Sequence, residues 1–427
     1  MHIWLVKIGE TLPIDSCPRL YRMGMLAQAL AASGHEITWW ASTWDHAQSR
    51  YRFAQDTTVE VMARYHLLLL HSTVTYQRAV SRNRAWQNWQ QARAFARSAN
   101  RLPPPHLIVS AMPTPDLADQ AVRFARAHRI PSVVDARDMW PDVISEVLSP
   151  AKRLVAWPYL AYMRRVLRHA CHGATGLTSI TEPFLDWIVR YAGRPRTSLD
   201  RAFPLAYSEP PPPSEAELMA AREFWWQKFR MRKGDGSSVV LFLGKLNRTI
   251  LAVFGDVLVA AEKLARERPD VRFVFGGDGD CANELRRRAS ARANIVFAGQ
   301  LGIHEMAAVK EMAAVALLPV QRRADYQMSL SNKVYDYLAA GLPIVSYLRG
   351  CVGDLLDQKA CGVCYDDAEG LSAALKQLHD QPEFRQKLGA ASRRVFEEQF
   401  DASRVYPQFV AYLEALAAAS RSPDGLF

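Results

Sequence analysis

The sequence has no long apolar run and few cysteines. Its longest leucine run, at residues 67–70, is far shorter than the roughly 20 apolar residues of a membrane-spanning helix. The first residues, Met1 to Val6, lack the basic segment and cleavage site of a signal peptide and predict a buried strand. Six irregularly spaced cysteines in 427 residues indicate reduced thiols in a cytosolic protein, not a disulfide framework.

Common nucleotide and metal motifs are also missing. After Val6 the chain continues through Lys7, Ile8 and Gly9 without a G-x-G-x-x-G pattern, which argues against nicotinamide or flavin binding. The absence of a Walker A loop excludes the commonest ATPases. The pair Cys361 and Cys364 has no second pair or histidine at zinc-ligand spacing, so we interpret it as structural.

Acidic residues are absent between Glu60 and Asp116. Residues 1–200 contain 24 Lys and Arg against 15 Asp and Glu, a net charge of +9, whereas residues 201–427 contain 29 against 28, a net charge of +1. The acid-free stretch holds seven arginines: Arg64, Arg78, Arg82, Arg84, Arg93, Arg97 and Arg101. This basic half predicts an anionic partner, namely nucleic acid, a phospholipid surface or a phosphorylated substrate. A solvated surface that keeps the chain soluble is the alternative.

Short β-rich runs alternate with amphipathic stretches along the chain. Strands are expected at residues 2–8, 37–40, 107–110, 130–134, 176–180, 239–243, 271–275, 294–297, 315–318 and 343–346. This alternation predicts an α/β protein with parallel sheets covered on both faces. A proline run at 210–213 marks a boundary. We therefore expect a domain at 1–207, a linker at 208–237, a second domain at 238–400 and a terminal helix at 401–427.

Two segments of the second half follow predicted strand ends. Lys245 and Arg248 come directly after the first strand of this half, where cations suit the diphosphate of a nucleotide, although ordinary loop charges are equally consistent. The glycines around Gly277 and Asp278 permit close backbone approach to a ligand, or form a plain turn.

The strongest pattern is the segment 331–345, S-N-K-V-Y-D-Y-L-A-A-G-L-P-I-V, in which a polar helix start leads to an Ala-x-Gly-x-Pro turn and a buried strand. It resembles the donor-site signature of family 4 glycosyltransferases. The segment 34–42 resembles the end of the first helix and the second strand in that family. The segment 133–141, which contains D-A-R-D-M-W-P, resembles a stretch of the lipopolysaccharide and capsule branch of the family. With Gly244-Lys245, 276–279 and 297–299, the resemblance spans nearly the whole chain in the right order.

The resemblance implies a GT-B fold: two Rossmann-like domains facing across a cleft, with the C-terminal helix crossing back to the N-terminal domain. It implies a glycosyltransferase, retaining in mechanism and of the hexosyl or N-acetylhexosaminyl type, that needs no metal and no cofactor. The donor is a nucleotide-sugar bound by the C-terminal domain. The acceptor, bound by the N-terminal domain, is a lipid-linked or cell-surface glycan of O-antigen, capsule or exopolysaccharide assembly.

The resemblance also assigns residues. The donor-binding set is Gly9, Lys245, Arg248, Gly277, Asp278, Gly299, Ser331, Asn332, Lys333 and Asp336. Asp138 and Arg137 are the catalytic candidates, with a helix cap as the alternative for Asp138, and Glu10, Arg19 and Arg22 are the acceptor-binding candidates. Many relatives carry two glutamates eight positions apart. Here Asp336 replaces the second and Met328 the first, and Met328 accepts no useful hydrogen bond.

Two segments combine aromatic and basic residues in a way that suits a membrane surface. Residues 79–99 carry Trp86, Trp89 and Phe95 among arginines, and residues 152–169 carry Trp157, Tyr159 and Tyr162 with five cations. We expect this face to dock on the anionic inner leaflet of the cytoplasmic membrane, unless the aromatics belong to the core.

Two rival functions remain. A UDP-sugar 2-epimerase of the same fold would need several acids and histidines, and a nucleic-acid-binding protein would leave the second domain unexplained.

Overall fold

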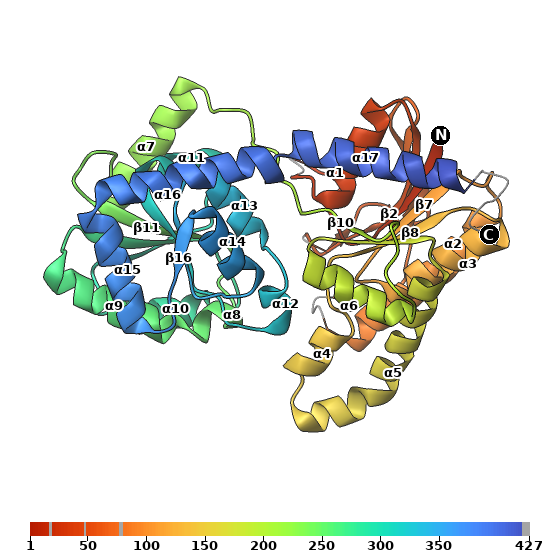
Figure 1. The fold of residues 1–427 in the computed structure, drawn as a ribbon, viewed down its shortest axis with the longest axis horizontal. Coiled ribbons are helices and arrows are strands. Elements are labelled where there is room, and N and C mark those ends of the chain that lie inside the picture. Colours follow the sequence, from red (N-terminus) through yellow and green to blue (C-terminus); the bar gives the residue numbers. More distant parts are fainter. Residues whose placement is uncertain (17–18, 47, 77–79, 421–427) are drawn as a thin grey trace. The chain divides into compact units, whose positions relative to one another are not determined.

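The computed structural model describes residues 1–16, 19–46, 48–76 and 80–420. The chain forms two compact units, one made of Met1–Ala206 with Ala402–Phe427 and the other of Tyr207–Asp401 (Figure 1). We call them unit 1 and unit 2. Within the described ranges, no helix combines the length and the apolarity that a bilayer span requires.

Unit 1 is built on an eight-stranded sheet whose order is β10-β9-β8-β7-β1-β2-β6-β5. Its strands are β1 (His2–Val6), β2 (Glu36–Ser42), β5 (Thr57–Met62), β6 (Tyr65–Leu70), β7 (Leu107–Ala111), β8 (Ser132–Ala136), β9 (Gly176–Ser179) and β10 (Arg201–Ala202). A separate two-stranded ribbon pairs β3 (Trp44–Asp45) with β4 (Arg50–Tyr51). All pairings of the large sheet are parallel except that of β5 with β6, so the expected all-parallel sheet gains one antiparallel edge strand.

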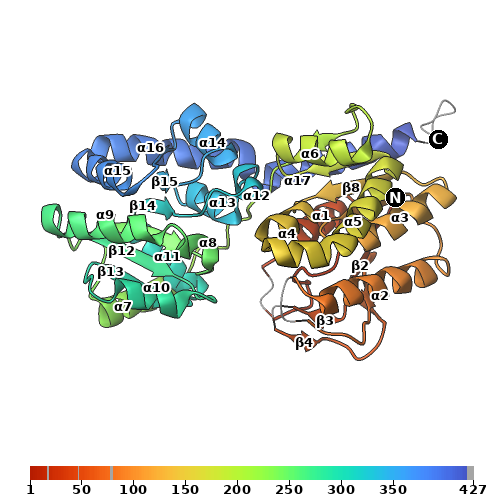
Figure 2. The ribbon, with the colours of Figure 1, turned by 90° about the horizontal axis from the view of Figure 1, so that it is seen from below.

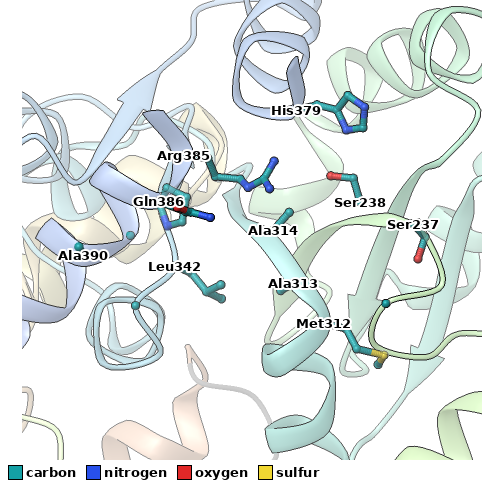
Figure 3. Close-up of a pocket in the computed structure, with 15 residues that line it drawn as sticks. Ser237, Ser238, Met312, Ala313, Ala314, Leu342, His379, Arg385, Gln386 and Ala390 are labelled. Carbon is teal, nitrogen blue, oxygen red and sulfur yellow. The ribbon is translucent and has the colours of Figure 1, made fainter. Parts of the chain in front are cut away.

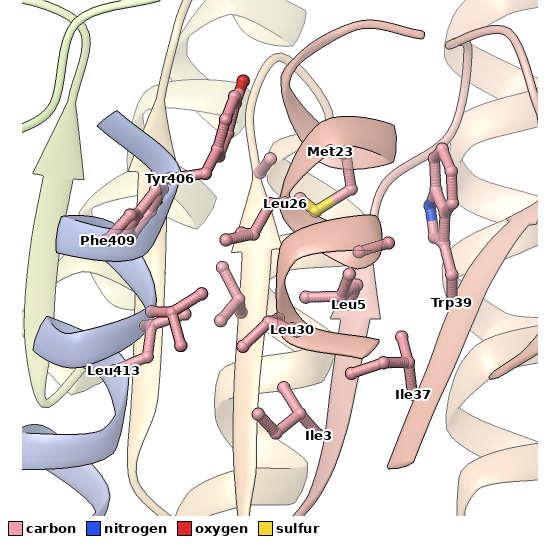
Figure 4. Packing of buried hydrophobic residues seen from close by; sticks show 14 of the residues in the cluster. Ile3, Leu5, Met23, Leu26, Leu30, Ile37, Trp39, Tyr406, Phe409 and Leu413 are labelled. Carbon is pink, nitrogen blue, oxygen red and sulfur yellow. The ribbon is translucent and has the colours of Figure 1, made fainter. Parts of the chain in front are cut away.

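Seven helices of unit 1 are described: α1 (Arg22–Ala32), α2 (Arg82–Ala99), α3 (Pro115–Ala127), α4 (Asp142–Val147), α5 (Pro150–Gly173), α6 (Glu182–Ala192) and α17 (Ala402–Ala419). Helix α17 packs against α1 (Figure 4): Phe409 and Leu413 lie in one buried cluster with Leu26 and Leu30. The C-terminal helix therefore completes the core of the N-terminal unit, because its apolar face covers the apolar face of α1.

Unit 2 has a six-stranded sheet of order β13-β12-β11-β14-β15-β16, parallel throughout, with helices on both faces (Figure 2). Its strands are β11 (Ser238–Leu243), β12 (Val271–Gly276), β13 (Ile295–Gly299), β14 (Ala313–Leu318), β15 (Ile344–Ser346) and β16 (Gly362–Cys364). Its helices are α7 (Glu215–Phe229), α8 (Arg248–Leu251), α9 (Phe254–Glu267), α10 (Ala282–Ala289), α11 (Ile303–Met312), α12 (Ala324–Gln327), α13 (Asn332–Ala339), α14 (Cys351–Lys359), α15 (Ala368–Asp380) and α16 (Pro382–Val395), followed by the π-helical turn η1 (Phe396–Phe400).

The segment 208–237, expected to be a linker, contains helix α7. Ser214 and Glu217 form a capping box at its start. Trp225 is fully buried, and its indole Nε1 donates a hydrogen bond to the Glu305 carbonyl at 2.9 Å. The segment is therefore structured and packed on unit 2.

Each large sheet contains a point at which the direction of strand addition reverses. In unit 1 this switch lies between β1 and β7, and in unit 2 it lies between β11 and β14. Ligands of open α/β sheets bind beyond the carboxyl ends of the strands at such a point. The two switch points therefore mark where functional residues are to be sought.

Candidate functional sites

The glycine loops of unit 2 pack against one another at the carboxyl edge of its sheet. The Gly244 amide donates to the Gly276 carbonyl at 2.9 Å, and the Gly277 amide donates to the Gly299 carbonyl at 2.6 Å. A Cβ on Gly277 would lie 2.1 Å from the carbonyl oxygen of Gly244. These glycines thus serve close approach between neighbouring loops, and together they form the floor of the switch point.

The Lys333 side chain lies on this floor. A Cβ added to Gly244 would meet the Cε of Lys333 at 2.2 Å and its Nζ at 3.0 Å. Lys333 makes no ion pair with any described residue, and burial lowers the pKa of its ammonium group. A half-buried cation without a counterion is costly in a folded chain. Its position at the switch point is suited to an anionic ligand.

Helix α13 is fixed in place by a buried tyrosine. The Tyr337 hydroxyl accepts the Leu243 amide hydrogen bond at 2.8 Å, at the last residue of β11. Because Lys333 and Tyr337 are four residues apart, they share one face of the helix. Ser331 directly precedes the helix, and its Oγ is buried without a hydrogen-bond partner in the described chain. Asn332, the first helical residue, is exposed.

Asp336 lies on the same helix and is already engaged. Its Oδ1 accepts a hydrogen bond from the Lys310 ammonium of α11 at 2.6 Å, while Oδ2 has no partner within the described residues. Sequence reasoning missed Lys310, because the pairing joins residues far apart along the chain. The available signal was weak: a lone lysine near the end of a helix.

The other predicted donor residues lie at the surface of the same edge. Lys245 is exposed and only 3.8 Å from the carboxylate of Asp280. Arg248, the first residue of α8, is exposed. The Asp278 carboxylate accepts a hydrogen bond from the amide of Gly279 at 2.8 Å. Of the three predicted donor-site cations, Lys333 alone is partly buried, whereas Lys245 and Arg248 are exposed.

A cavity of unit 2 lies at the opposite edge of the sheet, where the strands begin. It has a volume of about 560 Å³ and is lined by residues that begin strands, including Ser238 and Ala313, and by His379 and Arg385 (Figure 3). Because ligands of parallel sheets bind at the carboxyl edge, we do not include this cavity in the candidate site.

In unit 1, the predicted acceptor residue Arg22 is buried. Its Nε and Nη2 donate to the two carboxylate oxygens of Asp135, each at 2.9 Å, and its Nη1 donates to the carbonyls of Phe203 and Pro204. Burial alone would raise the pKa of Asp135, but Arg22 and Arg137 outweigh it and lower that pKa. Arg22 is therefore engaged in the interior of unit 1, and its contact with an acceptor stays a prediction.

Glu10 and Arg137 belong to the same network. Arg137 donates through Nη1 to one Glu10 oxygen and through Nε to Asp135 at 2.8 Å, while the other Glu10 oxygen accepts the Met23 amide hydrogen bond. Each Glu10 oxygen thus already accepts one hydrogen bond within unit 1, whereas Arg19 is exposed, and the acceptor roles of both residues stay predictions. The Arg137 Nη2 is buried without a partner among the described residues. We therefore retain Arg137 as a candidate.

Asp138 follows Arg137 beyond β8 and is half-buried. The alternative that it caps a helix is wrong, because the N-cap of the following helix, α4, is Pro141. Gly9, the remaining predicted donor residue, has a φ of +80° in the loop after β1, a backbone conformation that favours glycine. It belongs to unit 1, whereas the other donor candidates belong to unit 2.

Sequence reasoning also missed Lys7, the first residue after β1. Its Nζ donates to the Met112 carbonyl at 2.9 Å in the interior of unit 1. Burial, reinforced by Arg137 and opposed by Glu10, lowers the pKa of Lys7 to about 7. The signal that could have revealed it was its place at the carboxyl end of the central strand.

Two family models match the chain in succession. Residues 21–201 match the glycosyl transferase 4-like domain, and residues 237–381 match glycosyl transferases group 1. The boundary between the two matches falls where unit 1 passes into unit 2.

Curated relatives are similar over part of their length. Spore coat protein SA of Bacillus subtilis is 26% identical over 193 residues, which cover 42% of this chain and 49% of that protein. O-antigen chain mannosyltransferase C of Escherichia coli is 25% identical over 151 residues, covering 34% of this chain and 40% of the other. The chain spans about half the length or less of these relatives.

Among solved structures, one described as trehalose-6-phosphate from E. coli bound with UDP-2-fluoro glucose superposes with a TM-score of 0.69. It is 12% identical and covers 97% of this chain and 99% of its own. At this identity the likeness shows the fold, which is GT-B.

Proposed function

The chain belongs to the glycosyltransferases that these two domain models describe, and on that premise we propose that it transfers a sugar from a nucleotide-sugar to a lipid-linked glycan acceptor. The observation that carries the donor half is Lys333, a cation at the switch point of unit 2 that has no counterion among the described residues. The solved neighbour that binds a UDP-sugar supports this class of donor.

Unit 2 offers each part of such a donor a partner. The Lys333 ammonium and the N-terminus of α13 would neutralise the diphosphate, since both are positive and lie together. Ser331 Oγ, which lacks a partner, would add one hydrogen bond. The free oxygen of Asp336 would accept from ribose hydroxyls, and Lys310 would hold the carboxylate in position.

The transfer itself requires departure of the nucleoside diphosphate. The acceptor hydroxyl oxygen forms a bond to the anomeric carbon as the bond from that carbon to the diphosphate breaks. With retention of configuration, the leaving phosphate oxygen takes the hydroxyl proton, so no protein base is needed. Lys333 would stabilise the charge that grows on the diphosphate. We retain the expectation that no metal ion or cofactor participates.

The acceptor half of the proposal depends on the surface of unit 1. At the start of α5, the exposed apolar side chains Leu154, Val155 and Trp157 stand beside Lys152 and Arg153. In Figure 1 this segment extends beyond the other helices of unit 1. Apolar residues flanked by cations suit the headgroup zone of an anionic membrane. We therefore propose peripheral docking at the inner face of the cytoplasmic membrane, where a lipid-linked acceptor is present.

A thermal-shift screen against a panel of nucleotide-sugars tests the donor assignment. A ligand that binds only the native state raises the unfolding temperature, so at least one nucleotide-sugar should do so. The Lys333→Ala variant should show a clearly smaller shift at the same ligand concentration. If no nucleotide-sugar stabilises the wild-type chain, or if Lys333→Ala keeps the full shift, the proposal fails.

A further inference from the structure

A small polar cavity lies at the switch point of the unit 1 sheet. Its volume is about 140 Å³, and its walls come from the loop after β1, the end of β2, helix α2 and the loop after β7. Lys7, Trp44, Asn88 and Thr114 are among the lining residues. No Asp or Glu occurs among the described residues that line it.

Three polar side chains that line the cavity have no hydrogen-bond partner in the described part of the chain. They are Asn88 through Nδ2, Trp44 through Nε1 and Thr114 through Oγ1, and each residue is less than one-tenth exposed. A buried polar group without a partner costs about 1–3 kcal/mol. Because all three atoms are able to donate, the cavity suits a ligand with several acceptor oxygens.

The charges around the cavity also select an anion. Lys7 and Arg84 line it, and Arg137 lies close enough to lower the pKa of Lys7, while Glu10 and Asp138 oppose that effect. The room is that of roughly four or five water molecules. A phosphate group, with its compact shape and several oxygens, meets these requirements of size and charge.

An apolar groove lies beside this cavity. It has a volume of about 730 Å³, and its walls include Trp86 and Trp89 of α2 and Leu160 of α5. Arg84 lines both spaces, and its guanidinium carbon lies 4.2 Å from the Trp140 ring of the groove and 5.3 Å from the Tyr76 ring of the cavity. The polar cavity and the apolar groove therefore meet at a single arginine.

We propose that the cavity and the groove form one binding site for a lipid phosphate, with the phosphate beside Lys7, Asn88 and Arg84 and the hydrocarbon chain along Trp86 and Trp89. The cations beside the cavity and the apolar walls of the groove match the two ends of such a molecule. The proposal rests on the proposed function, because it supplies the acceptor site of that glycosyltransferase, but it assigns residues in unit 1 that the donor does not use.

The test is isothermal titration of the full chain with dodecyl phosphate below its critical micelle concentration. Lys7→Met and Arg84→Gln should each weaken binding by about tenfold or more, because each removes a charge-assisted contact. Ala156→Trp should fill the groove and weaken dodecyl phosphate but not inorganic phosphate. Arg101→Gln and Ala127→Trp, at exposed positions that line neither space, are the matched controls and should bind as wild type does.

Dodecanol and inorganic phosphate separate the two ends of the ligand, and each should bind more weakly than dodecyl phosphate. The proposal is overturned if dodecyl phosphate binds no better than dodecanol, or if Arg101→Gln weakens it as much as Arg84→Gln. Nucleotide-sugar stabilisation of each variant shows that the chain is folded. If the wild-type chain binds no dodecyl phosphate but is stabilised by a nucleotide-sugar, this site alone is refuted, whereas absence of nucleotide-sugar stabilisation in the wild type would refute the donor assignment.

Discussion

The two units have different groups at their switch points: mainly backbone in unit 2 and mainly charged side chains in unit 1. At the switch point of unit 2, backbone loops form the floor, and the Lys333 ammonium lies over them without a counterion. At the switch point of unit 1, Lys7 lies near a buried ionic network. The network is formed by Arg22, Asp135, Arg137 and Glu10. A site built from backbone tolerates side-chain change, whereas a site built from charged side chains depends on each member.

This contrast agrees with the division of labour that we propose. A nucleotide diphosphate presents the same groups to any enzyme, so one lysine, a helix N-terminus and glycine loops suffice. An acceptor differs from one enzyme to the next, and placed polar and charged side chains supply much of the specificity for it. If the contrast holds, unit 1 depends on a network of several buried charges, and unit 2 depends mainly on the single charge of Lys333.

The largest expected effect is the loss of the unit 1 network. Asp135→Asn removes the carboxylate that both Arg22 and Arg137 contact. Arg137 keeps its ion pair with Glu10, but the buried charge of Arg22 is left without a carboxylate partner. The free energy of unfolding should fall by about 3–5 kcal/mol. Tryptophan fluorescence in urea measures this loss, because nine of the eleven tryptophans belong to unit 1. Asp366→Asn, which disrupts an exposed pairing in unit 2, is the control and should leave the transition almost unchanged.

The next effect concerns donor binding. Lys333→Ala should weaken nucleotide-sugar binding by about 1.5–3 kcal/mol, roughly tenfold or more, because it removes a charge-assisted hydrogen bond. Lys245→Ala should weaken it less, since Lys245 is exposed and stands near Asp280. Titration calorimetry with the nucleotide-sugar found by screening compares the two variants. An effect of Lys245 equal to that of Lys333 would contradict the placement of the diphosphate.

Stability should also depend on pH through Lys7. Its pKa is about 7 in the folded chain and about 10.5 when unfolded, so the unfolded chain binds more protons between these values and stability rises with pH across that window. Below pH 7 the folded chain carries the whole cost of the buried charge. Lys7→Met should therefore be more stable than wild type at pH 6, by about 1–3 kcal/mol, and this gain should shrink towards pH 10. Urea unfolding at both pH values measures it, and a gain that grows with pH would refute the assignment.

A smaller effect is expected at the ribose contact. Asp336→Ala should weaken any nucleoside diphosphate, with or without its sugar, by about 0.5–1.5 kcal/mol, the net value of one hydrogen bond. Asp336→Glu should be tolerated, because it keeps a carboxylate for Lys310. Calorimetry with the diphosphate alone and with the complete nucleotide-sugar separates the roles. A variant that loses only the contribution of the sugar would contradict ribose binding.

The fold was predictable from sequence where a strand is a short apolar run. The expected strand at residues 239–243 corresponds to β11 (Ser238–Leu243), whereas the edge strand β5 was missed because it alternates polar and apolar residues. Strand β6 was also missed, although it ends in the leucine run at residues 67–70. Lys333 and Asp336 were singled out because their segment has a distinctive local pattern. Lys7, Lys310 and the burial of Arg22 were not predictable, since each depends on partners from 26 to 182 residues away.

The smallest effect per residue is expected at the membrane. Arg82, Arg93 and Arg97 are exposed on α2, and each cation near an anionic leaflet contributes about 1 kcal/mol that salt screens. We expect the chain to sediment with phosphatidylglycerol vesicles at low salt and to be released at high salt. Changing these three arginines to Gln should reduce sedimentation and leave nucleotide-sugar binding intact. Arg84 is left unchanged, because it lines the proposed lipid phosphate site.

The matched control changes Arg266, Arg287 and Arg288, which removes the same net charge from α9 and α10 of unit 2. Equal loss in the control would mean that net charge, and not the α2 face, drives binding, and equal sedimentation with phosphatidylcholine would mean that insertion of Leu154 and Trp157 dominates.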